Sequence, residues 1–140
     1  MSTATIRILL ADDHRLIRES WKNILENNLR FRVVADCDNN ESAIRQAQEL
    51  LPDIMLIDIN MLPEKGFRIA TQVVRDLFSV KVIGISVNNQ PKYAIRMVEL
   101  GAKGFFTKTS SLEEIIHGIT EVNQGSTYIC EEVRKYLPPA

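Results

Sequence analysis

Short apolar runs alternate with longer amphipathic stretches along the whole chain, and this alternation restricts the fold more than any other feature. Five runs have the length of a strand, and several are continuously apolar, which is typical of parallel strands covered on both faces. They are Ile6–Ala11, Phe31–Ala35, Ile54–Ile57, Val80–Ile85 and Gly104–Thr107.

After each run, apolar residues recur at the spacing of a helix face. These sets are Leu16, Ile17, Trp21, Ile24 and Leu25; Ala43, Ile44, Ala47 and Leu51; Ile69, Val73, Val74 and Leu77; Ala94, Met97 and Val98; and Leu112, Ile115, Ile116, Ile119 and Val122. Five strand–helix repeats predict an α/β fold with a parallel sheet and helices on both faces. Right-handed crossovers then favour a doubly wound, five-stranded, flavodoxin-like sandwich.

Helix boundary signals agree with this assignment. Asn89 before Gln90-Pro91 resembles an N-cap with proline in the first turn. Gly101 and Gly125 are typical of helix C-termini. For the last helix, Ser110 with Glu113 and Ser111 with Glu114 both fit a capping box, and the sequence leaves the choice open.

The length of 140 residues indicates one domain, which we expect to span residues 1–125. Residues 126–140 have weaker periodicity and end in "LPPA", so we expect a C-terminal extension or a linker. The net charge of −1 supplies no basic field for DNA or an anionic membrane. Without a membrane-length apolar run, a signal peptide or paired cysteines, a cytoplasmic protein with no membrane contact is expected.

Polar residues follow four of the predicted strands. Asp12 and Asp13 follow the first run, Asp58 the third, Ser86 the fourth and Lys108 the fifth. In a doubly wound sheet, ligands bind outside the carboxyl ends of the strands. We therefore expect these side chains to converge on one rim.

Three carboxylates at close quarters repel one another unless a cation lies between them. Oxygen ligands of this kind suit Mg²⁺, which takes one or two protein carboxylates and keeps several waters. We expect Asp13 and Asp58 as direct ligands, Asp12 acting through water, and the backbone carbonyl of Asn60 as the third protein ligand.

With Mg²⁺ in place, Lys108 and Ser86 could hold the oxygens of a phosphoryl group on Asp58, which would be the nucleophile. Taken singly, an aspartate at a strand end is more often a turn former, and an acidic pair before a helix suits the helix dipole. The joint occurrence at four strand ends favours a site.

These residues resemble the receiver domain of two-component response regulators. The resemblance rests on "LLADDH" (9–14), "LIDINMLPEKGF" (56–67), "VIGISVN" (82–88) and "GAKGFFTK" (101–108), and covers residues 6–124. "ADDH" and a lysine not followed by proline resemble most the NarL/FixJ subgroup. That subgroup usually joins its receiver to a LuxR-type helix-turn-helix DNA-binding domain.

The resemblance implies the (βα)5 receiver fold and phosphorylation of Asp58 by a histidine kinase, with Mg²⁺ held by Asp12, Asp13 and the following loop. It also implies that Ser86 and Lys108 contact the phosphoryl group. Coupling of Ser86 to Phe105 would then rearrange the surface of the fourth helix, last strand and fifth helix. The implied output is a homodimer, or transcription regulation through a DNA-binding domain beyond residue 140.

The chain departs from the receiver pattern at two places. Leu62 separates Met61 from Pro63, so the family pattern does not specify the conformation of the loop near the metal-binding carbonyl. Thr109 follows Lys108 where many receivers have proline and a cis peptide. A cis bond to threonine costs about 2.5–4 kcal/mol, so we expect a trans bond or a strained one held by phosphate.

Two other functions compete with the phosphorylation switch. A phosphatase of the haloacid dehalogenase kind needs an acid two residues after the nucleophile, and Asn60 cannot serve as one. We therefore expect no enzyme activity beyond self-phosphorylation and self-dephosphorylation. The second alternative is a receiver-like interaction scaffold that never binds phosphate.

Overall fold

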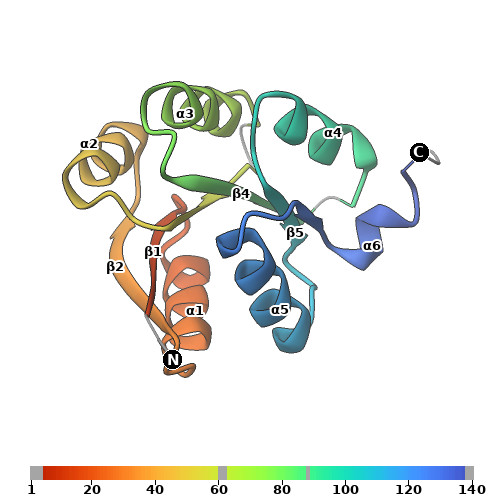
Figure 1. Cartoon of the computed structure of the whole chain (residues 1–140), viewed down its shortest axis with the longest axis horizontal. Helices are drawn as coiled ribbons and strands as arrows, with labels where there is room; N and C mark the ends of the chain where they lie inside the picture. The colour runs from red at the N-terminus through yellow and green to blue at the C-terminus, as the bar shows by residue number, and fades with distance from the viewer. Residues whose placement is uncertain (1–4, 60–62, 88, 138–140) are drawn as a thin grey trace.

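The computed structural model describes residues 5–59, 63–87 and 89–137 and shows alternating strands and helices (Figure 1). The strands are β1 (Ile6–Ala11), β2 (Phe31–Cys37), β3 (Ile54–Asp58), β4 (Lys81–Ser86), β5 (Gly104–Thr107) and β6 (Tyr128–Ile129). The helices are α1 (Arg15–Glu26), α2 (Asn40–Leu50), α3 (Pro63–Asp76), α4 (Pro91–Glu99), α5 (Leu112–Asn123) and α6 (Glu131–Arg134).

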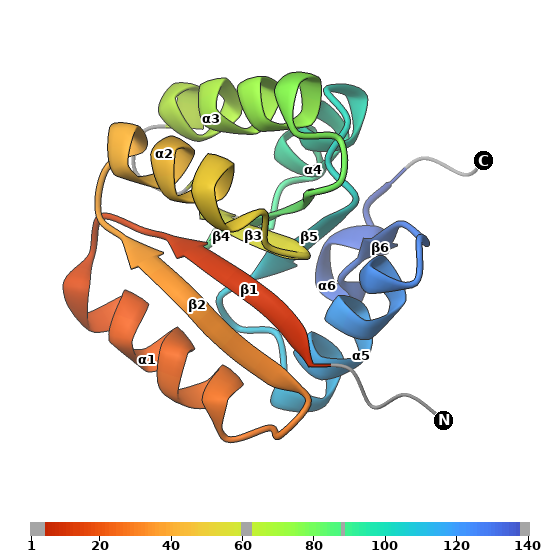
Figure 2. The same cartoon turned by 60° about the vertical axis from the view of Figure 1, so that its left-hand side comes forward.

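The sheet is parallel throughout, with strand order β2-β1-β3-β4-β5-β6. Helices α1 and α5 cover one face, and α2, α3 and α4 cover the other (Figures 1 and 2). The doubly wound α/β fold is therefore confirmed, and a sixth strand extends the expected five.

The continuous apolar strands form the core between the helix layers. All residues of β5, and all of β3 except its last, are buried. This two-sided burial explains why these strands lack a polar–apolar alternation. The helices contribute their apolar stripes to the same cluster, as Trp21 of α1 and Ile119 of α5 illustrate.

The helix ends follow the local signals with one shift. Gly101 and Gly125 have φ of +111° and +105°, in the left-handed region that glycine enters without a Cβ clash. Ser111 caps α5, since its side chain accepts from the backbone N–H of Glu114. The N-cap of α4 is Gln90 rather than the predicted Asn89, because Pro91 itself opens the helix and places the cap directly before it.

The C-terminal segment returns to the sheet edge, which helical and strand periodicity did not indicate. Residues 128–129 pair with β5, and α6 packs beside β5 and α4. Figures 1 and 2 both show α6 beyond the β5 edge. Within the described ranges, no helix combines the length and apolar character needed to cross a bilayer.

Candidate functional site

A cleft of about 440 Å³ opens at the carboxyl ends of β1 and β3. The strand order reverses at this point, because β1 connects outward to β2 while β3 starts the other half of the sheet. Asp12, Asp13 and Asp58 line the cleft, together with Asp38 and Asn39 from the loop between β2 and α2. The cleft lies where ligands bind in doubly wound folds.

Carboxylates from two strands meet in this cleft. Ligand atoms of Asp12, Asp13, His14 and Asp58 all lie within 4.8 Å of one another. The Asp12 and Asp58 side chains are only 8% and 5% exposed, whereas Asp13 is exposed to solvent. The structure thus brings together all three carboxylates that the sequence placed at this rim.

The Lys108 ammonium lies between the two buried carboxylates. Its Nζ donates to Asp58 Oδ2 over 3.1 Å and lies 3.8 Å from Asp12 Oδ2. Lys108 is itself only 11% exposed, so solvent screens these contacts weakly. The Lys108 ammonium therefore offsets part of the negative charge of Asp12 and Asp58, which lie at the ends of β1 and β3.

The three carboxylates of the cleft carry more negative charge than the Lys108 ammonium can neutralise. Burial, followed by the nearby charge of Asp58, raises the pKa of Asp12 to about 6, although the His14 backbone N–H and Lys108 oppose the rise. The donor set is all-carboxylate apart from His14, and hard oxygen donors around excess negative charge fit Mg²⁺. The predicted ligand Asn60 lies outside the described residues.

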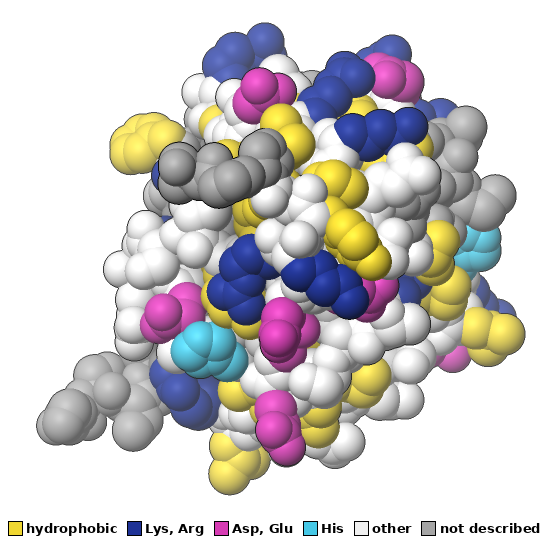
Figure 3. All heavy atoms as spheres, turned by 90° about the vertical axis from the view of Figure 1, so that its right-hand side faces the viewer, with side chains coloured by type: hydrophobic (Ala, Val, Ile, Leu, Met, Phe, Trp, Pro, Cys, Tyr) yellow, Lys and Arg dark blue, Asp and Glu magenta, His cyan; other side chains and the backbone are white. Residues whose placement is uncertain are grey.

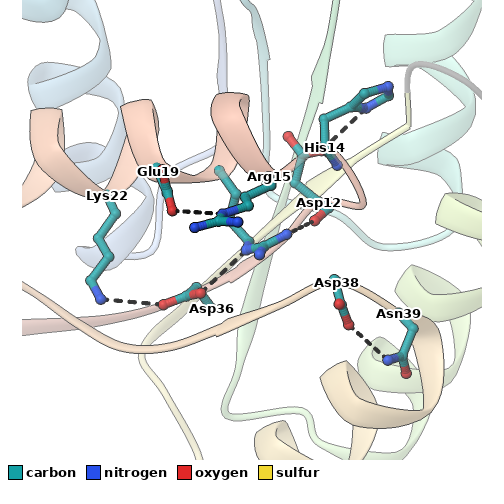
Figure 4. Close-up of polar contacts among 9 residues, drawn as sticks. Asp12, His14, Arg15, Glu19, Lys22, Asp36, Asp38 and Asn39 are labelled. Carbon is teal, nitrogen blue, oxygen red and sulfur yellow. Dashed lines mark hydrogen bonds and ion pairs between the residues drawn. The ribbon is translucent and has the colours of Figure 1, made fainter.

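Side chains of helix α1 hold the backbone at Asp12 in place. Arg18 donates from Nη1 to the Asp12 carbonyl oxygen over 2.8 Å and from Nε to Asp36 Oδ1 over 3.2 Å. Lys22 Nζ also donates to Asp36 Oδ2 over 3.3 Å, as Figure 4 shows. The Asp12 N–H donates to the Cys37 carbonyl, so both sides of the Asp12 backbone are bonded.

The first residues of α1 shape the mouth of the cleft. The His14 N–H donates to Asp12 Oδ1 over 2.8 Å, which fixes that carboxylate (Figure 4). The His14 ring lies with Nδ1 3.1 Å from Asp13 Oδ1. The backbone of His14 occupies the N-cap position of α1, but its side chain makes no capping hydrogen bond.

Ser86 and Phe105 lie on the neighbouring strands. Ser86 ends β4, is 1% exposed, and pairs in register with Thr107 of β5. The Lys108 N–H donates to the Ser86 carbonyl, so the serine and the lysine share one strand junction. Phe105 is fully buried, as expected for a phenylalanine in this strand, and pairs with Gly84.

Gly66 lets α3 approach the strand that carries Asp58. A Cβ on residue 66 would lie 2.4 Å from Ile59 Cγ2. Because Ile59 directly follows β3, a larger residue at 66 would displace the end of the strand and its aspartate. The glycine is therefore a structural part of the cleft.

Two residues beside the site escaped sequence reasoning. Arg18 had a weak signal, since it lies one helical turn beyond His14 on the helix that follows the acidic pair. Glu132 had none, because its contact with Thr109 joins segments 23 residues apart in sequence. The Lys108–Thr109 peptide is trans, like every other peptide bond in the described part of the chain.

Comparison with known proteins decides the family. The model of the response regulator receiver domain matches residues 8–120, which is most of the chain. The chain belongs to the response regulator receiver domain family.

This receiver domain is 33% identical over 132 residues to the transcriptional regulatory protein DegU of Brevibacillus brevis, covering 94% of this chain and 56% of DegU. The chain thus spans less than two thirds of that relative. The receiver domain of the putative response regulator NarL from Mycobacterium tuberculosis superposes with a TM-score of 0.80 at 28% identity, covering 87% of this chain and 98% of that one. A LuxR-family response regulator from Aurantimonas sp. SI85-9A1 shares the fold, with a TM-score of 0.88 at 24% identity and 94% coverage of both chains.

The comparisons thus identify this chain as a response regulator receiver domain, which is a signalling module. The proteins that it resembles include one named as a transcriptional regulatory protein and one named as the receiver domain of NarL. All residues of the acidic cleft lie within the matched range. Glu132, which contacts Thr109, lies beyond the end of that range.

Proposed function

We propose that this receiver is a switch operated by phosphorylation of Asp58. A phosphohistidine on a sensor histidine kinase would supply the phosphoryl group. The Asp58 carboxylate forms a new oxygen–phosphorus bond, the phosphorus–nitrogen bond breaks, and the imidazole keeps the electron pair. The observation that carries this proposal is the placement of Asp58, buried beside Asp12 and 3.1 Å from the Lys108 ammonium.

Each neighbouring side chain has a role that suits phosphoryl transfer, which depends on positioning and on charge stabilisation. Lys108 would stabilise the developing charge on one phosphoryl oxygen, and the Ser86 hydroxyl would donate a hydrogen bond to another. Asp12 and Asp13 would hold Mg²⁺ together with Asp58 and the carbonyl of Asn60. When bound, Mg²⁺ supplies positive charge to the carboxylates and to the transferring oxygens.

The output of the switch is a changed protein surface. Coupling between Ser86 and Phe105 would pass the state of Asp58 to the face of α4, β5 and α5. A homodimer contact on this face, and DNA binding by a further domain of the parent protein, are the outputs we propose. The length of DegU and its name as a transcriptional regulatory protein support this assignment. A kinase that uses ATP implies a cytoplasmic location.

Helix α4 carries four charged or aromatic side chains that could serve the dimer contact, and two of them, Tyr93 and Arg96, also hold α4 against α3. Arg96 donates to Glu64 and stacks 4.4 Å from the centre of the Phe67 ring, and Tyr93 packs on the same ring. Lys92 and Glu99 are exposed. A partner would therefore meet two side chains that are already ordered, which lowers the entropic cost of association.

The test is intact mass after incubation with Mg²⁺ and acetyl phosphate, whose phosphorus–oxygen bond breaks to release acetate. We expect one phosphoryl adduct that hydroxylamine removes and that Asp58→Asn lacks. Asp38→Asn makes the same charge change in the same cleft outside the carboxylate cluster, and should keep the adduct. Absence of the adduct from wild type, with Mg²⁺ binding also undetectable, would instead favour the phosphate-independent scaffold.

A further inference from the structure

Backbone hydrogen bonds and buried side chains anchor the C-terminal segment to β5. The Tyr128 N–H donates to the Lys103 carbonyl and the Cys130 N–H to the Phe105 carbonyl, each over 2.9 Å. Cys130 and Val133 are fully buried. Residues 128–134 therefore form part of the folded unit and lie beside β5, the strand that leads to Lys108.

One carboxylate of the segment, that of Glu132, contacts the turn that follows β5 and contains Lys108. Glu132 Oε1 accepts from Thr109 Oγ1 over 2.7 Å and from Thr107 Oγ1 over 3.0 Å. These hydroxyls lower the pKa of Glu132, so the ionised acceptor is favoured. Charge-assisted hydrogen bonds of this kind are short and strong compared with neutral ones.

The two threonines flank Lys108, and this fixes the direction of the lysine. The backbone turns after β5, where the Ser110 N–H donates to the Thr107 carbonyl. Both threonine hydroxyls meet Glu132, whereas the Lys108 side chain runs to the acidic cleft. Glu132 holds the threonines on the α6 side. Lys108 is then directed to the opposite side, where its Nζ meets Asp58 and Asp12.

A serine completes the same loop. Ser110 Oγ accepts from the Thr107 N–H over 3.2 Å and lies 3.3 Å from Thr107 Oγ1. Residue 109 is a threonine after a trans peptide, so the loop lacks the rigid ring that a proline at this position would supply. Its geometry depends instead on hydroxyl groups that converge on a single carboxylate.

We propose that Glu132 is a positioning residue for the phosphorylation site. It holds the segment 107–109 in the conformation that directs Lys108 to Asp58, so that the site is incomplete without the C-terminal segment. The inference rests on the proposed phosphorylation of Asp58. By linkage, a group that aids phosphoryl binding is itself stabilised when the phosphoryl group is bound.

The experiment compares four variants of the full chain with wild type: Glu132→Gln, Glu131→Gln, Thr109→Val and Thr109→Ser. The first measurement is the rate of adduct formation from acetyl phosphate and Mg²⁺. Glu132→Gln and Thr109→Val should slow it about tenfold, the scale expected when a catalytic group is misdirected by a fraction of an ångström. Glu131→Gln, on the same helix, and Thr109→Ser, which keeps the hydroxyl, should match wild type.

Two further measurements separate positioning from a general loss of structure. The Mg²⁺ dissociation constant, followed by Trp21 fluorescence, should stay within about twofold in Glu132→Gln, because Glu132 contacts none of the carboxylates that would bind the ion. Beryllofluoride with Mg²⁺ should slow hydrogen exchange of the α6 amides in wild type but not in Glu132→Gln. If Glu132→Gln fails to fold, the Thr109→Val and Thr109→Ser pair gives the same test.

The outcomes distinguish the inference from the proposed function. If wild type takes no phosphoryl group, the proposed function fails, and this inference fails with it. If wild type is phosphorylated while Glu132→Gln and Thr109→Val react at the wild-type rate, the positioning role alone is overturned. Parallel loss of Mg²⁺ affinity and rate in Glu132→Gln would likewise overturn it, since that pattern indicates a damaged fold.

Discussion

Arg18 binds the backbone carbonyl of Asp12 over 2.8 Å while its Nε donates to Asp36, 3.2 Å away. One guanidinium on α1 thereby connects the ends of β1 and β2. The side chain is 14% exposed, so these bonds are largely shielded from water. The position of the acidic pair thus depends on a residue that is not itself acidic.

Replacing Arg18 should disturb both the fold and the metal site. We expect Arg18→Ala to lower the free energy of unfolding by about 1–3 kcal/mol, the range for losing hydrogen bonds from a charged group. Mg²⁺ affinity should fall several-fold with it, as Trp21 fluorescence and urea titrations would show. Lys22→Ala, which removes a more exposed contact to Asp36, should cost less than about 1 kcal/mol. Equal effects of the two variants would contradict the role given to Arg18.

The raised pKa of Asp12 predicts a pH dependence of stability. Because the folded pKa of about 6 exceeds the ordinary value of 3.8, the folded state binds more protons across this window. The contribution of Asp12 to stability therefore falls as pH rises through about 6. Without divalent cations, Asp12→Asn should be more stable than wild type by roughly 2–3 kcal/mol at neutral pH, with the gain vanishing near pH 4. Urea unfolding across this range measures the gain.

Saturating Mg²⁺ provides the control for that experiment. The cation offsets the buried charge of wild type and has fewer carboxylates to bind in Asp12→Asn. The stability gain of the variant should therefore shrink or reverse when Mg²⁺ is added. A gain independent of both pH and Mg²⁺ would mean that the charge of Asp12 is not its source.

Lys108 should have opposite effects on the metal and on the phosphoryl group. Its ammonium repels a cation bound by Asp58 and Asp12, so Lys108→Met should bind Mg²⁺ several-fold more tightly. The same variant should form the acetyl phosphate adduct at least about tenfold more slowly, because a donor to the developing charge is lost. Lys103→Met, at the other end of β5, should change neither quantity. Weaker Mg²⁺ binding by Lys108→Met would contradict this electrostatic account.

Gly118 makes room for the contact between β5 and the C-terminal segment. A Cβ there would lie 2.5 Å from Phe106 Cζ and 2.7 Å from a Tyr128 ring carbon. Gly118→Ala should therefore destabilise the domain by about 1–3 kcal/mol, although alanine favours a helix by about 1 kcal/mol. Gly125→Ala meets no atom within 4 Å and tests only the cost of positive φ. Thermal unfolding of both variants separates crowding from backbone strain.

Much of the fold could be predicted because each strand signal was local and agreed with the next. β1 and β5 have the predicted limits, and β2, β3 and β4 differ from theirs by one or two residues. Asp12, Asp13, Asp58 and Lys108 could be placed together from the rule that parallel strands end at one rim. Burial and charge then brought them within a few ångströms of one another.

The rest depends on contacts between distant segments. β6 has two residues and α6 has four, too few for either periodicity to be recognised. Tyr128 finds its place through a hydrogen bond to Glu114, and Glu114 also accepts from the Glu131 N–H. The capping pattern assigned the Glu114 side chain to the start of its own helix, but this side chain instead holds the C-terminal segment.

The short strand β6 also decides what the sheet offers to its surroundings. It pairs with Gly104 and Phe105, in a strand whose four residues are all buried. An uncovered edge with two adjacent phenylalanines would be a template for another chain, and proteins generally protect such edges. The C-terminal segment therefore covers the edge of β5, and a chain that lacked the segment would offer the backbone of Gly104 and Phe105 for pairing with another chain.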